Sequence, residues 1–167
     1  MITLLLGGAA SGKSVVAERL AARLPQPVTY VATGEAIDAD MAARIEAHRT
    51  RRPAGWRTVE AGAALVEAVR DLNSGETVLI DALGTWVAAT PGFDADGAAL
   101  AAALAGRLGH TVVVSDEVGL GVHPATEVGR RFRDALGAVN QQVAEVAGDV
   151  LLVVAGRAMR LAAVEQA

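Results

Sequence analysis

The residues best suited to chemistry lie near the start of the chain, in a segment that fits the phosphate-binding pattern G-x-x-x-x-G-K-[ST]. Its residues are Gly7, Gly8, Ala9, Ala10, Ser11, Gly12, Lys13 and Ser14. Glycines let the backbone N–H groups point at phosphate oxygens, and a following helix adds its positive dipole end. Lys13 can reach the β- and γ-phosphates, while the Ser14 hydroxyl can ligate Mg²⁺. The segment predicts a nucleoside triphosphate site. A glycine-rich turn that fits by chance is disfavoured, because the only lysine of the chain falls in register.

Two carboxylates follow candidate strands. Asp81 ends the run T-V-L-I-D, the Walker B form in which the acid holds Mg²⁺ directly or through water. Alternatively, Asp81 caps the helix that follows, although we expect the metal role beside a phosphate-binding loop. Glu117 lies in a glycine-rich loop, where it could bind metal or activate an acceptor hydroxyl, or be a solvated loop acid. We retain it as an acceptor-side candidate.

A histidine stands among arginines in residues 44–53. If this segment is helical, Arg44, His48 and Arg52 share one face, and Pro53 ends the helix. Neighbouring positive charge favours the neutral, nucleophilic imidazole, which could attack phosphorus and form a phosphoramidate. From the residues alone, a solvated basic helix with an incidental histidine is the plainer interpretation.

Short apolar runs alternate with segments of helical period along the chain. The expected strands cover residues 2–6, 28–32, 77–80, 111–115 and 150–155, and the expected helices cover 13–24, 38–51, 63–72, 96–108 and 127–147. Because the strands are apolar on both faces, they suit a parallel sheet covered by helices on both sides. We expect a single α/β P-loop domain over residues 1–167. In such a sheet, ligands gather at the carboxyl ends of the strands, where the phosphate-binding loop, Asp81 and Glu117 fall.

Composition narrows the class of protein. The 167 residues are 52% hydrophobic but only 3% aromatic, so the core must be built from Ala, Val and Leu. A net charge of −4 argues against a nucleic-acid partner, and the lack of cysteine excludes disulfides and thiolate metal sites. The first apolar run is too short for a signal peptide or a membrane span. We therefore expect a cytoplasmic protein without membrane insertion.

Seven segments together resemble the bifunctional adenosylcobinamide kinase/adenosylcobinamide-phosphate guanylyltransferases of cobalamin biosynthesis. These are GGAASGKS, YVATGE, MAARIEAHRTRRPAGWRTVE, VLIDALGTW, VSDEVGLGVHP, RRFRDALGAVNQQVAEVA and LLVVAGRAMRL. The phosphate-binding loop is common to many families, whereas H-R-x-x-R-P-x-x-W joined to E-V-G-x-G and F-R-D-x-L-G-x-x-N-Q is far more specific. The resemblance covers nearly the whole chain.

The resemblance implies two reactions. ATP or GTP phosphorylates the hydroxyl of adenosylcobinamide; His48 then takes GMP from GTP and passes it to adenosylcobinamide phosphate, giving adenosylcobinamide-GDP and pyrophosphate. Besides the phosphate-binding loop, the implied nucleotide contacts are Thr33, Gly34, Glu35, Arg49, Thr50, Arg51, Arg52, Glu60 and Asp81. Glu60 is a chemically reasonable guanine reader, because a carboxylate can accept from N1–H and N2–H₂. The family also implies Mg²⁺, a recombinase-like core and a homotrimer.

Some positions depart from the family pattern. Ala82 stands where cysteine is common, Gly84-Thr85 replaces Thr-Leu, Asp116 replaces asparagine, and Arg157-Ala158 replaces Leu-Pro. Asp116 adds negative charge beside the expected acceptor site. A chain that performs only one of the two reactions is one alternative. A P-loop regulatory module is another, and His48 argues against it because a conformational switch needs no nucleophile.

Overall fold

The computed structural model describes residues 1–34 and 39–163, which form one seven-stranded sheet in the order β3-β2-β4-β5-β1-β6-β7. The strands are β1 (Ile2–Gly7), β2 (Val28–Ala32), β3 (Arg57–Glu60), β4 (Thr77–Asp81), β5 (Thr111–Asp116), β6 (Asp149–Val154) and β7 (Arg157–Leu161). All neighbouring pairs are parallel except β6 and β7, which form an antiparallel hairpin. The sheet is therefore mostly parallel, as predicted.

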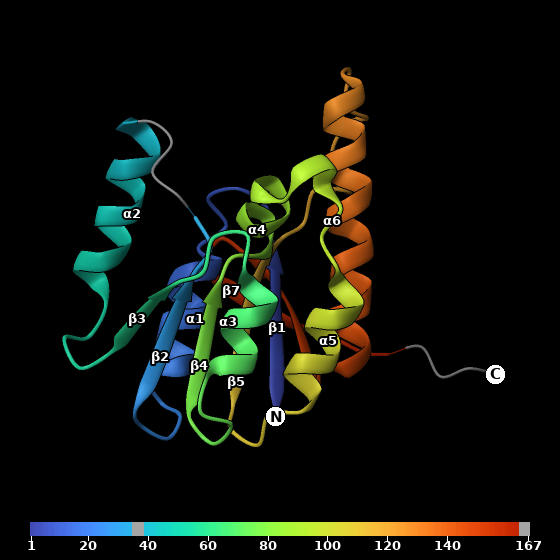
Figure 1. The fold of residues 1–167 in the computed structure, drawn as a ribbon. Helices are drawn as coiled ribbons and strands as arrows, with labels where there is room; N and C mark the ends of the chain where they lie inside the picture. The colour runs from blue at the N-terminus through green and yellow to red at the C-terminus, as the bar shows by residue number, and fades with distance from the viewer. Residues whose placement is uncertain (35–38, 164–167) are drawn as a thin grey trace.

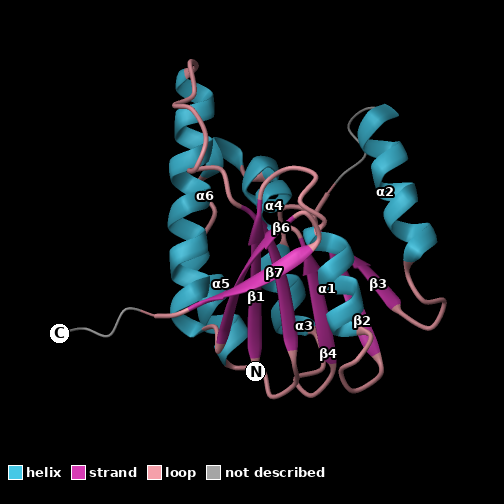
Figure 2. Ribbon diagram, turned by 180° about the vertical axis from the view of Figure 1, so that it is seen from behind, coloured by secondary structure: helices cyan, strands magenta, loops and turns pink. Residues whose placement is uncertain are grey.

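Helices cover both faces of this sheet. They are α1 (Lys13–Ala21), α2 (Ala39–Arg51), α3 (Leu65–Asp71), α4 (Leu83–Ala89), α5 (Gly97–Ala105) and α6 (Glu127–Val146), with a 3₁₀ helix at Pro91–Phe93. In Figures 1 and 2, α1 covers one face while α3, α5 and α6 cover the other. Helix α2 stands apart from them at the β3 end of the sheet (Figures 1 and 2). The predicted α/β fold with helices on both faces is confirmed.

The core has two layers because successive strand residues point to opposite faces. On β1, Leu4 packs on the side of α3 to α6, and Leu5 packs on the side of α1; both are fully buried. Tyr30 and Trp86 are also buried, and the remaining core is mostly Val, Leu and Ala. Within the described residues, no helix combines the length and apolar character needed to cross a bilayer.

Besides the short 3₁₀ helix, three elements were not predicted: β3, β7 and α4. All five residues of β7 are exposed, so this edge strand lacks the buried alternation by which strands are recognised. The β3 strand has only four residues, three of them exposed, so it too gives little of the alternating pattern. Helix α4 has only seven residues and follows β4 after a single residue, so its apolar positions extend the pattern of the strand. The expected strands and helices otherwise match to within a few residues at each end.

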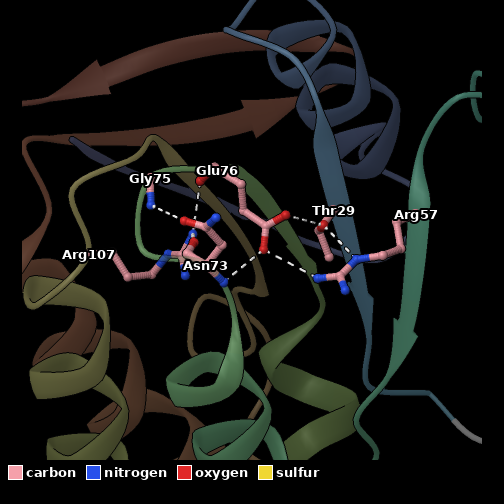
Figure 3. A network of polar contacts seen from close by, with 6 residues as sticks. All are labelled: Thr29, Arg57, Asn73, Gly75, Glu76 and Arg107. Carbon is pink, nitrogen blue, oxygen red and sulfur yellow. Dashed lines mark hydrogen bonds and ion pairs between the residues drawn. The ribbon is translucent and has the colours of Figure 1, made fainter.

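A polar network ties the amino ends of several strands together (Figure 3). The Glu76 carboxylate accepts hydrogen bonds from Thr29 Oγ1 at 2.8 Å, Asn73 N at 3.1 Å and Arg57 Nη2 at 3.3 Å. Arg107, buried before β5, donates to the carbonyls of Asn73 at 3.1 Å and Glu76 at 2.9 Å. These contacts fix the end of the sheet opposite the phosphate-binding loop.

Candidate nucleotide-binding site

The phosphate-binding loop connects β1 to α1 and is held in shape by neighbouring turns. Gly12 has a φ of 86° and an added Cβ would lie 3.1 Å from the Cα of Gly156, so glycine is required there. Gly156 N–H, in the turn between β6 and β7, donates to the Ser11 carbonyl at 2.8 Å. On the other side, Glu117 N–H donates to the Gly7 carbonyl at 3.0 Å. The loop is therefore braced from both neighbouring strands.

Ser14, at the start of α1, and Asp81, at the carboxyl end of β4, lie side by side. Ser14 Oγ donates to Asp81 Oδ1 at 3.3 Å, and the Tyr30 hydroxyl donates to Asp81 Oδ2 at 2.8 Å. Burial, and then the negative charge of Asp81, raise the pKa of Tyr30 well above its usual value, so its hydroxyl remains a donor. A hydroxyl next to a carboxylate is an oxygen pair of the kind that Mg²⁺ accepts beside nucleotide phosphates. The N-cap of helix α4 is Ala82, so Asp81 does not cap this helix. The Asp81 carboxylate instead faces Ser14 of the phosphate-binding loop.

Lys13 forms an ion pair with Asp116, a residue noted above only because it departs from the family pattern. Its Nζ lies 2.6 Å from Asp116 Oδ1 and donates to the Gly8 carbonyl at 3.3 Å. Asp116 ends β5 in register with Gly7 of β1, which places it beside the loop. A prediction that β1 and β5 pair would have revealed this neighbour. The Glu117 carboxylate instead accepts from Gly119 N at 2.8 Å and Leu120 N at 3.0 Å, within its own loop.

A cavity of about 410 Å³ opens over these residues. Its lining includes Lys13 and Ser14 from the start of α1, Asp81 and Asp116 from the carboxyl ends of β4 and β5, and Phe132 from α6. Its volume lies in the range of small-molecule sites. The cavity thus combines a cation, oxygen ligands for a metal, and an apolar wall.

A second cavity of about 450 Å³ lies between β2, β3 and α2, and shares Gly34, Ile45 and Arg52 with the first. Arg49 and Glu60 also line it. Their charged groups are 4.0 Å apart and exposed by 56% and 76%, which makes a loose ion pair. Both groups are therefore available to a polar ligand.

Arg52 lies at the boundary of the two cavities. Its guanidinium carbon is 3.3 Å from the centroid of the Tyr30 ring, a cation–π contact, and its Nη1 donates to Thr58 Oγ1 at 3.3 Å. Arg51 lines neither cavity. It forms a 3.2 Å ion pair with the nearly buried carboxylate of Glu18 on α1. The Thr50 hydroxyl donates to the Glu46 carbonyl at 2.9 Å, within α2.

Three predicted site residues remain: Thr33, Glu35 and His48. Thr33 is fully buried, and its hydroxyl lies 2.6 Å from both the Ala82 carbonyl and the Thr85 hydroxyl. Glu35 lies outside the described residues. The backbone of His48 belongs to α2, three positions after Ile45, whereas its side chain is outside the described part of the structure. Tyr30 and Phe132 were not predicted; both are apolar rings in a chain with few of them.

Comparisons with known proteins complete the description. The family described as "Cobinamide kinase / cobinamide phosphate guanyltransferase" matches residues 3–161. The bifunctional adenosylcobalamin biosynthesis protein CobP of Pseudomonas aeruginosa is 42% identical, over 96% of this chain and 97% of its own. The protein CobU of Escherichia coli, which has the same description, is 39% identical over 96% and 99%.

A solved structure of an ATPase from the type III secretion system of pathogenic bacteria has a TM-score of 0.53 at 10% identity. The match covers 90% of this chain and half of the ATPase chain, and it shows a shared P-loop fold alone. The family match and the two relatives agree over nearly the full length of the sequence. The chain is thus an enzyme of the cobinamide kinase/cobinamide phosphate guanyltransferase family.

Proposed function

We propose that this chain phosphorylates adenosylcobinamide with ATP or GTP, and then transfers GMP from GTP through His48 to adenosylcobinamide phosphate. The observation that carries the proposal is the pair of adjoining cavities. One lies on the phosphate-binding loop, and the other lies against α2, the helix to which His48 belongs. Arg52 lines both cavities and offers a fixed positive charge at their boundary.

In the kinase step, the acceptor hydroxyl oxygen attacks the γ-phosphorus, the bond to the bridging oxygen breaks, and the nucleoside diphosphate leaves. The hydroxyl proton passes to solvent. Backbone N–H groups of the loop and the Lys13 ammonium stabilise the charge that spreads over the transferred group. Ser14 and Asp81 would hold Mg²⁺, which supplies further neutralisation of the phosphate oxygens.

In the guanylyl step, a nitrogen of neutral His48 attacks the α-phosphorus of GTP and releases pyrophosphate. A phosphate oxygen of adenosylcobinamide phosphate then attacks the same phosphorus, and the P–N bond breaks to regenerate the imidazole. Arg49 and Arg52, which line the second cavity, are suited to binding the phosphates. In the same cavity the exposed Glu60 carboxylate is suited to the guanine N–H groups.

The guanylyl step is tested by incubating the full chain with Mg²⁺ and α-labelled GTP and measuring intact mass. We expect an acid-labile, alkali-stable GMP adduct on the wild type that is lost in His48→Ala. His123→Ala is the matched control, because His123 is exposed and contacts Arg133 on α6, away from α2. An unlabelled, folded wild type, or a labelled His48→Ala, would refute the His48 route.

The kinase step is tested separately with γ-labelled ATP or GTP and adenosylcobinamide. Transfer of label to the acceptor in His48→Ala is expected, because this step does not use the histidine. We also propose a single-domain, cytoplasmic homotrimer, in keeping with the family resemblance. Light scattering on the purified chain tests the trimer, and a monomer at working concentration would contradict it.

A further inference from the structure

The ammonium of Lys13 is already bound to an internal anion. Lys13 Nζ lies 2.6 Å from Asp116 Oδ1, and the two side chains are only 13% and 32% exposed. The same ammonium donates to the Gly8 carbonyl, so it lies across the loop whose N–H groups are suited to phosphate. A short ion pair between partly buried groups is stronger than a solvated surface pair.

The Asp116 carboxylate occupies space that is free because residue 84 is a glycine. A Cβ added to Gly84, in the first turn of α4, would overlap Asp116 Oδ2 and lie 3.2 Å from Asp116 Cγ. Any larger residue at position 84 would therefore displace the Asp116 carboxylate from its position beside Lys13.

The backbone of Asp116 is fixed from the opposite side. Asn140 on α6 donates through Nδ2 to the Asp116 carbonyl at 3.1 Å, and its Oδ1 accepts from Ser115 Oγ at 2.5 Å. Ser115 is fully buried. The carboxylate is thus presented to Lys13 from an anchored strand end, whereas the long lysine side chain is the partner that can move.

We propose that Asp116 is an internal competitor for the phosphate chain: it holds Lys13 in the nucleotide-free enzyme and must release this lysine when the triphosphate binds. This inference rests on the proposed nucleotide site. Asp116 acts through Lys13 and is a positioning residue. When Lys13 moves to the phosphates, the Asp116 carboxylate remains in the lining of the same cavity and repels them. Nucleotide affinity is therefore lower than the loop alone would provide.

The test is calorimetric titration of the full chain with ATP in EDTA, so that no metal bridges the carboxylate and the phosphates. The isosteric Asp116→Asn should bind ATP about tenfold more tightly than the wild type, since a charged hydrogen-bond partner of Lys13 is removed. Gly84→Ala, which pushes the carboxylate aside, should act in the same direction. Gly137→Ala is the matched control, because an added Cβ there meets nothing within 4 Å.

The double variant Gly84→Ala/Asp116→Asn distinguishes displacement of the Asp116 carboxylate from a direct effect of the methyl group that Gly84→Ala introduces. If Gly84→Ala acts by displacing Asp116, it should add little to the affinity of Asp116→Asn, whereas a direct contact with the nucleotide would add in full. Unchanged or weaker binding by Asp116→Asn would overturn the inference. So would loss of phosphoryl transfer at unchanged affinity, because Asp116 would then act on the acceptor or the metal.

Lys13→Met distinguishes failure of this inference from failure of the nucleotide site itself. If ATP binding to the wild type is absent both in EDTA and with Mg²⁺, or does not depend on Lys13, the proposed nucleotide site is wrong. If binding depends on Lys13 and Asp116→Asn does not strengthen it, only the competitor role is overturned.

Discussion

The Tyr30 hydroxyl donates a 2.8 Å hydrogen bond to Asp81 Oδ2 across the neighbouring strands β2 and β4. The face of the same ring carries the guanidinium of Arg52, and the other oxygen of Asp81 accepts from Ser14. A continuous set of contacts thus runs from the end of α2 to the start of α1. It links the residues at the boundary of the two cavities to the oxygen pair suited to the metal.

Replacement of Tyr30 by Phe should lower the free energy of unfolding by about 1 kcal/mol, the typical contribution of a hydrogen bond. The ring and its contact with Arg52 remain, so the change isolates the hydroxyl. We also expect a severalfold higher KM for the Mg²⁺–nucleotide, because the Asp81 carboxylate loses one of its orienting contacts. Urea denaturation and steady-state kinetics measure the two effects, and an unchanged KM would show that Asp81 needs no help from Tyr30.

Alkaline stability should report on the same residue, which is the only tyrosine of the chain. The raised pKa of Tyr30 means that the folded protein keeps its proton at a pH where the unfolded chain releases it. The unfolded state then binds fewer protons, so stability falls as pH rises above about 10, by at most about 1.4 kcal/mol per pH unit. Tyr30→Phe should flatten this decline. An equally steep decline in the variant would contradict the assignment.

The neighbouring arginines at the end of α2 should have separable roles. Arg52→Met is expected to raise KM for nucleotide in both reactions by about tenfold or more, since it removes a charge that lines both cavities. Arg51→Met removes the ion pair with Glu18 and should mainly lower stability, with little change in KM. Kinetics and thermal unfolding of the two variants provide matched controls for each other. Equal KM effects would show that both arginines reach the substrate.

Glu76→Gln should destabilise the fold by about 2 kcal/mol without affecting nucleotide binding, since a nearly buried carboxylate loses charge-assisted hydrogen bonds. The network shown in Figure 3 lies at the amino ends of the strands, whereas the phosphate-binding loop follows the carboxyl end of β1. Glu145→Gln, at an exposed position of α6, is the control and should be neutral. Urea midpoints compare the two. A neutral Glu76→Gln would mean that the network contributes no net stability.

Gly97→Ala should cost about 1–3 kcal/mol through overpacking between α5 and α6. An added Cβ would overlap Gln142 Oε1 and lie 3.2 Å from the Cα of Val139, which cannot move without shifting the helix. Gly137→Ala, on the same pair of helices but in open space, should instead be neutral or stabilising, because alanine favours helix. Thermal unfolding of both variants tests the difference, and equal melting temperatures would exclude a packing role for Gly97.

Much of the fold could be predicted because its signals are local. Buried parallel strands such as β4 are apolar on both faces, and the helices between them carry their own period. The β7 strand could not be recognised, since its pairing with β6 depends on the left-handed turn at Ala155 and Gly156 and not on a buried face. Edge strands of this kind are specified by tertiary context.

The site was predictable where a motif fixes the spacing, and much less so where residues meet across strands. Lys13, Ser14 and Asp81 follow from two motifs, and the structure brings them together. The pairing of Lys13 with Asp116 depends on the register of β1 and β5, which residue spacing does not reveal. The position of Arg52 over Tyr30 likewise depends on how α2 packs beyond the sheet edge.

The hairpin of β6 and β7 has a consequence for how the protein is made. Strand β1 lies between β5 and β6, and the turn at Gly156 hydrogen-bonds to Ser11 of the phosphate-binding loop. Strand β1 is synthesised well before β6 and β7, so its own surroundings stay incomplete until that hairpin has formed. A nascent chain truncated before β6 should be unable to retain nucleotide, and it should gain that ability only after the β6–β7 hairpin has been synthesised.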